Sequence, residues 1–243
     1  MLSSSGIGKK TALILADIGY TTWTIPDLAK WINLACVDLV QAKPSALTAK
    51  AAMQLEAGTS QTLDGATFVD PFGQPLSLRP LQLLEVVRNM GADGTIPGPA
   101  VVGIDRKVLD VALPGWHAVP AGSAIQFVMF NPKFPKSFFN YPAATTSPAM
   151  FLEVVLSRLP NNTLSDDATV LGTNDIDAGL DDVYESPLVD NVLYRALSQD
   201  TENQFYLQRS QNHYRAFATA LGVRLQNEAR QRPERQFDAP TGE

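Results

Sequence analysis

Acidic side chains concentrated in one stretch of the sequence are the strongest candidates for chemistry. Between Leu159 and Tyr194 the chain carries eight acids and neither Lys nor Arg. They are Asp166, Asp167, Asp175, Asp177, Asp181, Asp182, Glu185 and Asp190. Hard cations such as Ca²⁺ take about six to eight oxygen ligands, so a cation site is one interpretation. The EF-hand pattern fails, however, because Gly179 and Leu180 follow where an acid and then Gly are needed. A solvated acidic loop is the preferred interpretation.

The other reactive side chains do not form a catalytic set. A catalytic His requires a nucleophile and an orienting acid, and no Gly-x-Ser-x-Gly elbow accompanies His117 or His213. Both histidines are therefore predicted to pack or to form surface hydrogen bonds. Cys36 is the single cysteine, which excludes an intramolecular disulfide and a cysteine-based zinc site. We expect no catalytic residue, no metal ion, no cofactor and no enzymatic activity.

A short glycine-containing motif near the N-terminus resembles a phosphate-binding loop. The motif is Gly6-Ile7-Gly8-Lys9-Lys10-Thr11. A P-loop needs Gly five residues before its Gly-Lys pair and Ser or Thr directly after the Lys. Ser3 and Lys10 occupy those two positions, and no strand precedes them. A solvated helix start is the simpler interpretation.

The C-terminal residues combine basic side chains with one aromatic side chain. The candidate contact residues are Arg230, Arg232, Arg235 and Phe237. Acids at 228, 234, 238 and 243 dilute the positive charge, which argues against a nucleic-acid arm. We interpret the segment as one that becomes ordered on a protein partner, with simple disorder as the alternative.

Composition excludes several classes of protein. The chain has 243 residues, of which 45% are hydrophobic and 18% charged, as in globular proteins. Its net charge of −6 gives no basic field that could hold nucleic acid. No apolar run reaches the roughly 18 residues of a membrane span, and the N-terminus is too polar for a signal peptide. We therefore expect synthesis in the cytoplasm and no membrane partner.

The pattern of elements predicts an α+β fold, with helices near both chain ends and a small antiparallel β domain between them. The expected zones are residues 1–44 (N-terminal helices), 45–160 (β domain), 161–228 (acidic loop and C-terminal helices) and 229–243 (extended tail). In the first zone Thr24 and Pro26 open a helix, because Thr caps well and Pro suits the first turn. Apolar residues from Leu28 to Leu39 then recur every three or four positions.

Short strands and turns dominate the prediction for the middle zone. Strands are predicted at 83–89, 125–130, 137–141 and 151–156, and one short helix at 105–113. Residues 51–56 fit a strand or a helix, and both remain open. Gly58-Thr59-Ser60-Gln61 and Gly91-Ala92-Asp93-Gly94 are predicted turns. In the third zone, helices open at Ser186-Pro187 and near Glu202, and Gly222 ends the second helix or is carried through it.

The order of several segments resembles that of the head-to-tail adaptor proteins of tailed phages. The stretch from Trp23 to Asn33 is similar to their opening W-x-x-x-x-L-x-x-W-I/L-N pattern. Further similar segments are Leu84–Gly91, Ile104–Asp110, Leu180–Tyr184, Val192–Asp200 and Gln211–Gly222. The resemblance spans about residues 10 to 222, and the chain departs from it around Phe68 to Pro80 and after Leu221.

This resemblance implies a structural role in the virion, at the head-to-tail junction. It also implies a helical bundle built from N- and C-terminal helices, with the β domain between them. Such adaptors form a ring, commonly of roughly twelve copies, beneath the portal of a filled capsid. They extend the DNA channel and present a docking surface to the tail nozzle or tube. The implied partners are the portal ring, the tail protein and further copies of the chain. Genomic DNA would pass through without specific binding.

The resemblance implies roles for two sets of residues. The Arg-bearing tail (Arg230, Arg232, Arg235 and Phe237) is expected to dock on the portal. Asp166, Asp167, Asp175, Asp177, Asp181 and Asp182 are expected to face the channel. Like charge there would repel DNA phosphates. The alternatives are a lower neck or tail-completion protein, a metal-dependent cytosolic enzyme built on the acids, and a DNA-binding regulator, against which the net charge argues.

Overall fold

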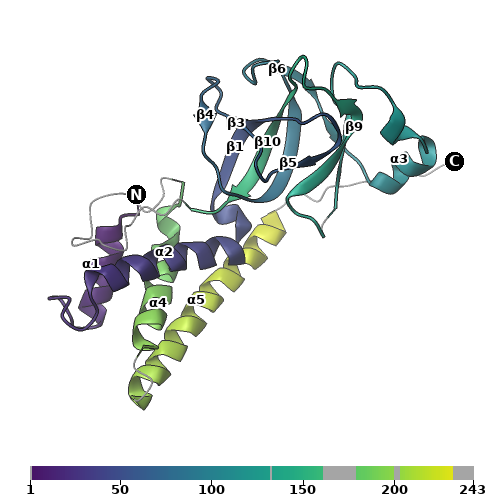
Figure 1. Cartoon of the computed structure of the whole chain (residues 1–243). Helices are drawn as coiled ribbons and strands as arrows, with labels where there is room; N and C mark the ends of the chain where they lie inside the picture. The colour runs from purple at the N-terminus through teal and green to yellow at the C-terminus, as the bar shows by residue number, and fades with distance from the viewer. Residues whose placement is uncertain (1, 132, 161–178, 200–202, 232–243) are drawn as a thin grey trace. The chain divides into compact units, whose positions relative to one another are not determined.

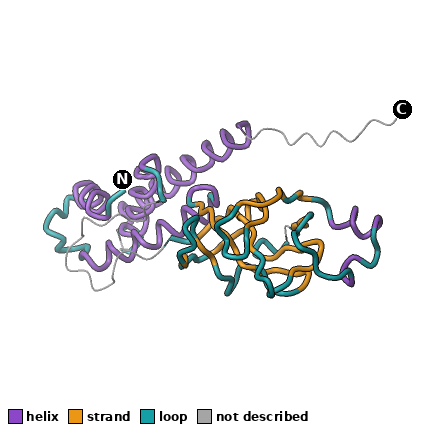
Figure 2. Tube along the Cα trace, turned by 90° about the horizontal axis from the view of Figure 1, so that it is seen from above, coloured by secondary structure: helices purple, strands orange, loops and turns teal. Residues whose placement is uncertain are grey.

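The chain folds as two compact units, a helical unit and a β unit, and the predicted α+β class is confirmed (Figure 1). The computed structural model describes residues 2–131, 133–160, 179–199 and 203–231, with side chains described as far as residue 222. The helical unit comprises Met1–Lys43 and Asn162–Glu243, and the β unit comprises Pro44–Asn161. All named strands belong to the β unit (Figure 2). No helix in the described parts of the chain is both long and apolar enough to cross a bilayer.

The helical unit is built around one central helix. Its elements are α1 (Ser4–Ile14), α2 (Ile25–Ala42), the 3-10 turn η3 (Asp182–Tyr184), α4 (Glu185–Leu197) and α5 (Gln204–Gln231). Helix α4 packs against α1, α2 and α5 (Figure 1). Its apolar face is fully buried at Leu188, Val192 and Leu193. Gly222 lies inside α5, so the helix continues through it.

Helix α2 forms where capping and periodicity predict it. The Thr24 side chain accepts a hydrogen bond from the Asp27 amide, and Pro26 lies in the first turn. Leu28, Ile32 and Leu39 have no more than 1% of their surface exposed, as their three- and four-residue spacing predicts. This burial against α4 stabilises the helix more than its intrinsic propensity does.

A partly buried polar network joins α2 to α4. The carboxylate of Asp38 accepts hydrogen bonds from Asn191 Nδ2 and from the guanidinium of Arg195. Arg195 Nε also donates to Asn191 Oδ1 at 2.9 Å. Only 1% of Asn191 is exposed, so each of its polar atoms needs such a partner. The network therefore fixes how α2 packs on α4.

The β unit has two sheets that share one core. The six-stranded sheet has the order β4-β3-β1-β10-β5-β6, and the four-stranded sheet has the order β2-β9-β8-β7. The strands are β1 (Thr48–Gln54), β2 (Gly58–Thr62), β3 (Phe68–Val69), β4 (Pro75–Leu76), β5 (Pro80–Met90), β6 (Pro97–Ala100), β7 (Val102–Gly103), β8 (Phe127–Phe130), β9 (Ser137–Ala144) and β10 (Phe151–Arg158). A short 3-10 turn, η1 (Pro44–Ala46), precedes them. Met53 and Leu152 from one sheet and Val128 and Phe138 from the other belong to the same buried cluster.

The outer face of the six-stranded sheet carries one charged cluster. Glu153 on β10 pairs with Lys50 on β1 at 2.8 Å and with Arg88 on β5 at 2.6 Å. Burial raises the pKa of Glu153, but hydrogen bonds from Lys50 and Arg88 outweigh it and leave that pKa below its ordinary value. The three side chains thus link three neighbouring strands.

One local prediction for the β unit is wrong, and one pair of strands departs from the predicted antiparallel arrangement. Strand β7 pairs in parallel with β8, whereas the other named strand pairs are antiparallel. The connection between them contains α3 (Arg106–Ala112) and the turn η2 (Trp116–Ala118), and parallel neighbours require such a crossover. The predicted turn at 58–61 is wrong, because these residues lie in strand β2, which pairs with β9. Residues 51–54 lie in strand β1, which is one of the two alternatives left open for 51–56.

The sequence does not predict strand β2, because its polar side chains are held by contacts with residues distant in sequence. Gln61 is 2% exposed, and its Nε2 donates to the Glu56 carbonyl at 2.8 Å and to Asn140 Oδ1 at 3.2 Å. Asn140 in turn donates to the carbonyls of Gly58 and Pro142. Gly58 has a φ of +114°, which glycine tolerates at the start of the strand. A Gly-Thr-Ser-Gln sequence has turn composition, and only partners distant in sequence make it a strand.

Candidate interaction surfaces

The predicted acidic residues fall mostly outside the described part of the chain. Asp166, Asp167, Asp175 and Asp177 lie outside the described residues. Asp181 and Asp182 are exposed at η3, where Asp181 Oδ1 accepts a hydrogen bond from the Val183 amide at 3.1 Å. Among the residues that the structure describes, no three His, Cys, Asp or Glu side chains are grouped to hold a metal ion. Asp181 therefore caps a turn while it remains open to solvent.

The predicted tail begins at the end of α5. This helix continues to Gln231, so the backbone of Arg230 is helical. Arg232, Arg235 and Phe237 lie outside the described residues. Their role in docking stays a prediction.

Both histidines make local structural contacts. His213 Nδ1 lies 2.9 Å from Asp190 Oδ1, which joins α5 to α4. The His117 ring stacks on Trp116 with 3.5 Å between ring centroids, and its Nδ1 lies 3.1 Å from Thr59 Oγ1. Cys36 is buried on the apolar face of α2.

The glycine motif at the N-terminus is part of helix α1. Ser3 caps the helix, and its side chain accepts a hydrogen bond from the Gly6 amide. Ile7, Gly8 and Thr11 are buried, so this stretch packs into the helical unit. Lys10 points outward and pairs with Glu185 at 2.6 Å. These residues are therefore used in folding, and a phosphate-binding geometry is not formed.

A tight loop between α1 and α2 holds the N-terminal part of the helical unit. The Ala16 amide donates to the Leu13 carbonyl and the Asp17 amide to the Ala12 carbonyl, which is the Schellman pattern at a helix end. Ala16 has a φ of +57°, where glycine is usually found. Asp17 then accepts hydrogen bonds from the amides of residues 21, 22 and 23.

These hydrogen bonds strongly stabilise the ionised form of Asp17. Backbone hydrogen bonds from Trp23 and Thr21 lower its pKa to about 2, against an opposing effect of burial. Trp23 is thereby held so that its Nε1 donates to the Ala196 carbonyl at the end of α4, at 3.1 Å. The loop thus connects α1, α2 and α4.

An Ala16→Gly substitution is expected to stabilise the helical unit. The left-handed conformation costs an L-residue about 1–2 kcal/mol, and glycine avoids this cost. Glycine is also more flexible in the unfolded chain, which offsets part of the stabilisation. We expect a net gain of about 0.5–1 kcal/mol, measured as a higher urea midpoint by circular dichroism at 222 nm. Ala216→Gly, at an exposed position inside α5, is the control and should lower the midpoint. If Ala16→Gly lowered the urea midpoint as much as Ala216→Gly does, the proposed strain at Ala16 would be contradicted.

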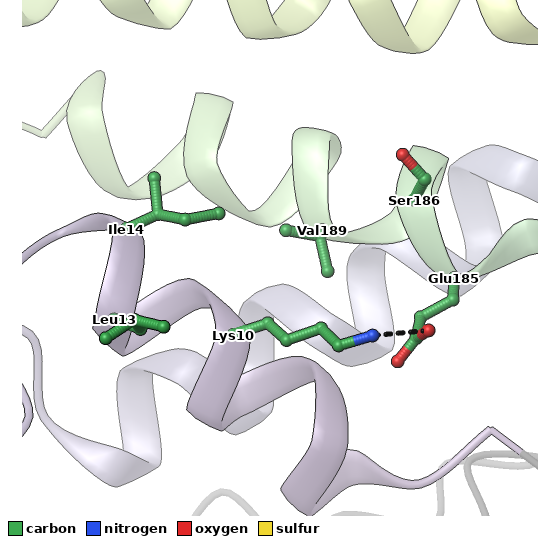
Figure 3. A pocket seen from close by; sticks show the side chains of 6 residues that line it. All are labelled: Lys10, Leu13, Ile14, Glu185, Ser186 and Val189. Atoms are coloured by element: carbon green, nitrogen blue, oxygen red, sulfur yellow. Dashed lines mark hydrogen bonds and ion pairs between the residues drawn. The ribbon is translucent and has the colours of Figure 1, made fainter.

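An apolar groove opens between α1 and α4. It is lined by Lys10, Leu13, Ile14, Glu185, Ser186 and Val189 and has a volume of about 290 Å³ (Figure 3). Leu13 is 67% exposed and Ile14 44% exposed, although both are large and apolar. The Lys10–Glu185 ion pair closes one end of it (Figure 3). An exposed apolar groove with a charged rim is typical of an interaction site.

A second hollow lies beside the loop that Asp17 holds. Its volume is about 460 Å³, and its aromatic lining consists of Trp23, Trp31 and Tyr206. Trp23 and Tyr206 meet edge to face, with 6.2 Å between ring centroids. Asp27 supplies a carboxylate at its edge. This hollow places part of the Trp23–Asn33 stretch, which carries the sequence resemblance, at the surface of the helical unit.

The β unit presents apolar side chains on two protruding segments. Phe72 is 84% exposed at the tip of the β3–β4 hairpin. The hairpin is ordered, because Asp70 Oδ1 accepts hydrogen bonds of 2.8 Å from the amides of Phe72 and Gln74. On α3, Val111 is 82% exposed. The sequence analysis did not single out these residues, although Asp70-Pro71-Phe72-Gly73 has the composition of an ordered turn.

Comparison with protein families decides the assignment. A family model described as SU10 adaptor protein matches residues 7–238 of the chain. The chain belongs to the SU10 adaptor protein family. The predicted resemblance to phage head-to-tail adaptors is thereby confirmed. Comparison with curated proteins gave no match.

The family assignment also revises the extent of the resemblance. The match continues to residue 238, although the sequence analysis expected a departure from the family after Leu221. All four candidate docking residues, Arg230 to Phe237, therefore lie within the adaptor match. The protein is a structural phage adaptor by family, and such a protein is part of the virion. Its exposed apolar groups are therefore candidate contact sites for other virion proteins.

Proposed function

We propose that this adaptor forms a ring that docks under the portal, extends the DNA channel and provides the attachment surface for the tail nozzle or tube. The match of residues 7–238 to the SU10 adaptor family carries this proposal. The exposed apolar groups on both units support it, because a subunit between two other proteins needs contact surfaces of its own. A ring of roughly twelve copies is the proposed assembly.

The acidic stretch is proposed to line the channel. Asp181 and Asp182 are exposed, and the net charge of the chain is −6. Like charge on a channel wall repels DNA phosphates, so the genome would pass without being held. The same role is proposed for Asp166, Asp167, Asp175 and Asp177. In this account DNA is a passing cargo of the ring and not a specific ligand.

The C-terminal segment that starts at Arg230, in the last turn of α5, is proposed to dock on the portal. It contains three Arg side chains and Phe237 within 15 residues of the C-terminus. Arg forms forked hydrogen bonds with carboxylates, and an aromatic side chain can anchor in a groove. Such a segment would add affinity without altering the two folded units.

The combined substitution of Arg230, Arg232 and Arg235 by Gln, with Phe237→Ala, is expected to abolish portal docking. Losing one anchor of this kind typically costs about 2 kcal/mol or more of binding free energy, so the loss from four should exceed 30-fold in affinity. Biolayer interferometry on immobilised portal rings would measure it. A chain lacking only residues 240–243 is the control and should bind like the intact chain. Full binding by the quadruple variant, with an unchanged melting temperature, would contradict the docking role of the tail.

A further inference from the structure

The hollow beside the Asp17 loop has the chemistry of a site for a positively charged side chain. Its volume is about 460 Å³, and its aromatic lining consists of Trp23, Trp31 and Tyr206. The face of an aromatic ring carries partial negative charge and attracts a cation within about 6 Å of the ring centroid. Asp27 adds a carboxylate, and the described residues that line the hollow include no Lys, Arg or His. We call this site the aromatic hollow.

The aromatic hollow is held in place before any ligand arrives. Trp23 Nε1 donates to the Ala196 carbonyl at 3.1 Å, and the Tyr206 ring meets the Trp23 ring edge to face. Trp31 is only 9% exposed, so the packing of α2 fixes it. Binding groups that are already ordered lose little conformational entropy when they bind, which favours affinity.

The charge of Asp27 is not neutralised within the described part of the chain. Its Oδ2 accepts a hydrogen bond of 2.6 Å from the hydroxyl of Thr24, which is a neutral donor. Asp27 is exposed, and among the described residues no cation forms an ion pair with it, including Lys30 one turn further along α2. Arg209 of α5 lies over the Phe205 ring instead, 5.7 Å from its centroid.

Arg215 is an exposed arginine on α5 that forms no ion pair and no ring contact with the described residues. The side of α5 around it is polar and exposed, with Gln208, Gln211 and Thr219. Positions 206 and 215 are separated by about 180° around a helix and by about 14 Å along its axis. Arg215 and Tyr206 therefore lie on opposite sides of α5, and Arg215 does not reach the aromatic hollow of its own copy.

We propose that the aromatic hollow of one copy receives the Arg215 guanidinium of the next copy. A guanidinium is planar and weakly hydrated, so it stacks on aromatic rings and forms forked hydrogen bonds with a carboxylate such as that of Asp27. Two different surfaces on each subunit make a heterologous contact, which is the type that generates rings. The proposal rests on the ring-forming function proposed above and names a contact between neighbouring copies.

Charge and placement favour a second copy as the occupant. Every subunit carries both an unpaired carboxylate among aromatic rings and an unpaired guanidinium, so a ring pairs each of them with its complement. Opposite charges at an interface also fix its register and suppress wrong pairings. A closed isologous dimer would require both residues to face the same partner, and their placement on opposite sides of α5 disfavours it.

Stepwise loading of portal rings tests the contact between copies. The purified chain is added to portal rings of the same phage at less than one copy per portal subunit, and native mass spectrometry counts the copies on each ring. Contacts between neighbouring copies make filling cooperative. The wild-type chain should therefore give mostly empty and complete rings, with few that are partly filled.

Arg215→Ala and Asp27→Asn should each give partly filled rings. Asp27→Asn keeps an oxygen that accepts the Thr24 hydrogen bond and removes only the charge. Each substitution should raise the chain concentration that half-fills the portal about tenfold, which is the size of one desolvated cation–ring contact. The double variant should lose little more than either single variant, because both substitutions remove the same contact.

Two further variants serve as comparisons. Arg215→Lys keeps the charge but not the planar guanidinium, and it should fill the portal less cooperatively than the wild type and more cooperatively than Arg215→Ala. Lys9→Ala removes an exposed cation of α1 and should fill the portal like the wild type. All these positions are exposed, so the melting temperatures should stay unchanged.

Four outcomes would overturn the proposal. All-or-none filling by Arg215→Ala would show that other surfaces join the copies, and the ring would stand without this pairing. Random filling by the wild-type chain would show that docked copies do not contact one another. Complete loss of portal binding by Asp27→Asn, at an unchanged melting temperature, would assign the aromatic hollow to the portal. No binding of the wild-type chain to the portal would remove the proposed function, and the pairing would fail with it.

Discussion

A Trp116→Ala variant is expected to lose about 3–5 kcal/mol of the free energy of unfolding of the β unit. Trp116 is completely buried, in a small cluster with Leu109 of α3 and Met129 of β8. Its indole Nε1 donates to Asp110 Oδ1 at 2.8 Å. The single side chain therefore holds the crossover between β7 and β8 against the sheet.

Substitution by Ala leaves a cavity and removes the indole donor from Asp110, which keeps its ion pair with Arg106. The surrounding residues collapse only partly, so the lost burial and the cavity both contribute. Urea unfolding followed by near-ultraviolet circular dichroism measures the loss. His117→Ala is the matched control, since His117 stacks on Trp116 but is exposed, and it should cost about 0.5 kcal/mol or less. Equal effects of the two substitutions would contradict the central position of Trp116.

An Asp17→Ala variant is expected to unfold the helical unit at clearly lower temperature than the wild type at pH 7. The Asp17 carboxylate accepts hydrogen bonds from three successive amides and from the Thr21 hydroxyl. Without it the amides of residues 21–23 lose their acceptor, and Trp23 loses its position beside Ala196. The melting temperature of Asp17→Asn, which keeps one acceptor oxygen, should lie between those of Asp17→Ala and the wild type. Lys9→Ala, at an exposed position of α1, is the control and should leave the melting temperature unchanged.

The effect of Asp17 on stability should depend on pH in one direction. Its pKa is lowered from 3.8 to about 2 on folding, so the unfolded state binds the proton more tightly. The stabilisation is fully present above pH 3.8 and is lost as the pH falls through about 2. The melting temperatures of wild type and Asp17→Asn should therefore converge on acidification. A difference that stays constant from pH 7 to pH 2 would contradict this account.

Elements with strong local signals were predictable from the sequence. Helix α2 combines a capping Thr24, an early Pro26 and apolar residues at helical spacing, and the structure has it at Ile25–Ala42. Strand β10 was predicted at 151–156 and runs from Phe151 to Arg158. These segments need no distant partner to reveal their type, because their patterning and caps already agree with the fold.

Elements that depend on distant partners were not predictable. Strand β2 has the composition of a turn and becomes a strand through Gln61 and Asn140, which are 79 residues apart. The parallel pairing of β7 with β8 follows from how the α3 segment packs, which no local pattern records. The groove is likewise formed by residues near positions 10 and 185, which only the packing of α1 on α4 brings together.

The most direct test of the ring proposal is the mass of the complex with the portal. The purified chain is mixed with the portal ring of the same phage, and the product is weighed by native mass spectrometry. The account predicts one complex in which the number of adaptor copies equals the number of portal subunits. A free monomer beside an unchanged portal ring would contradict it.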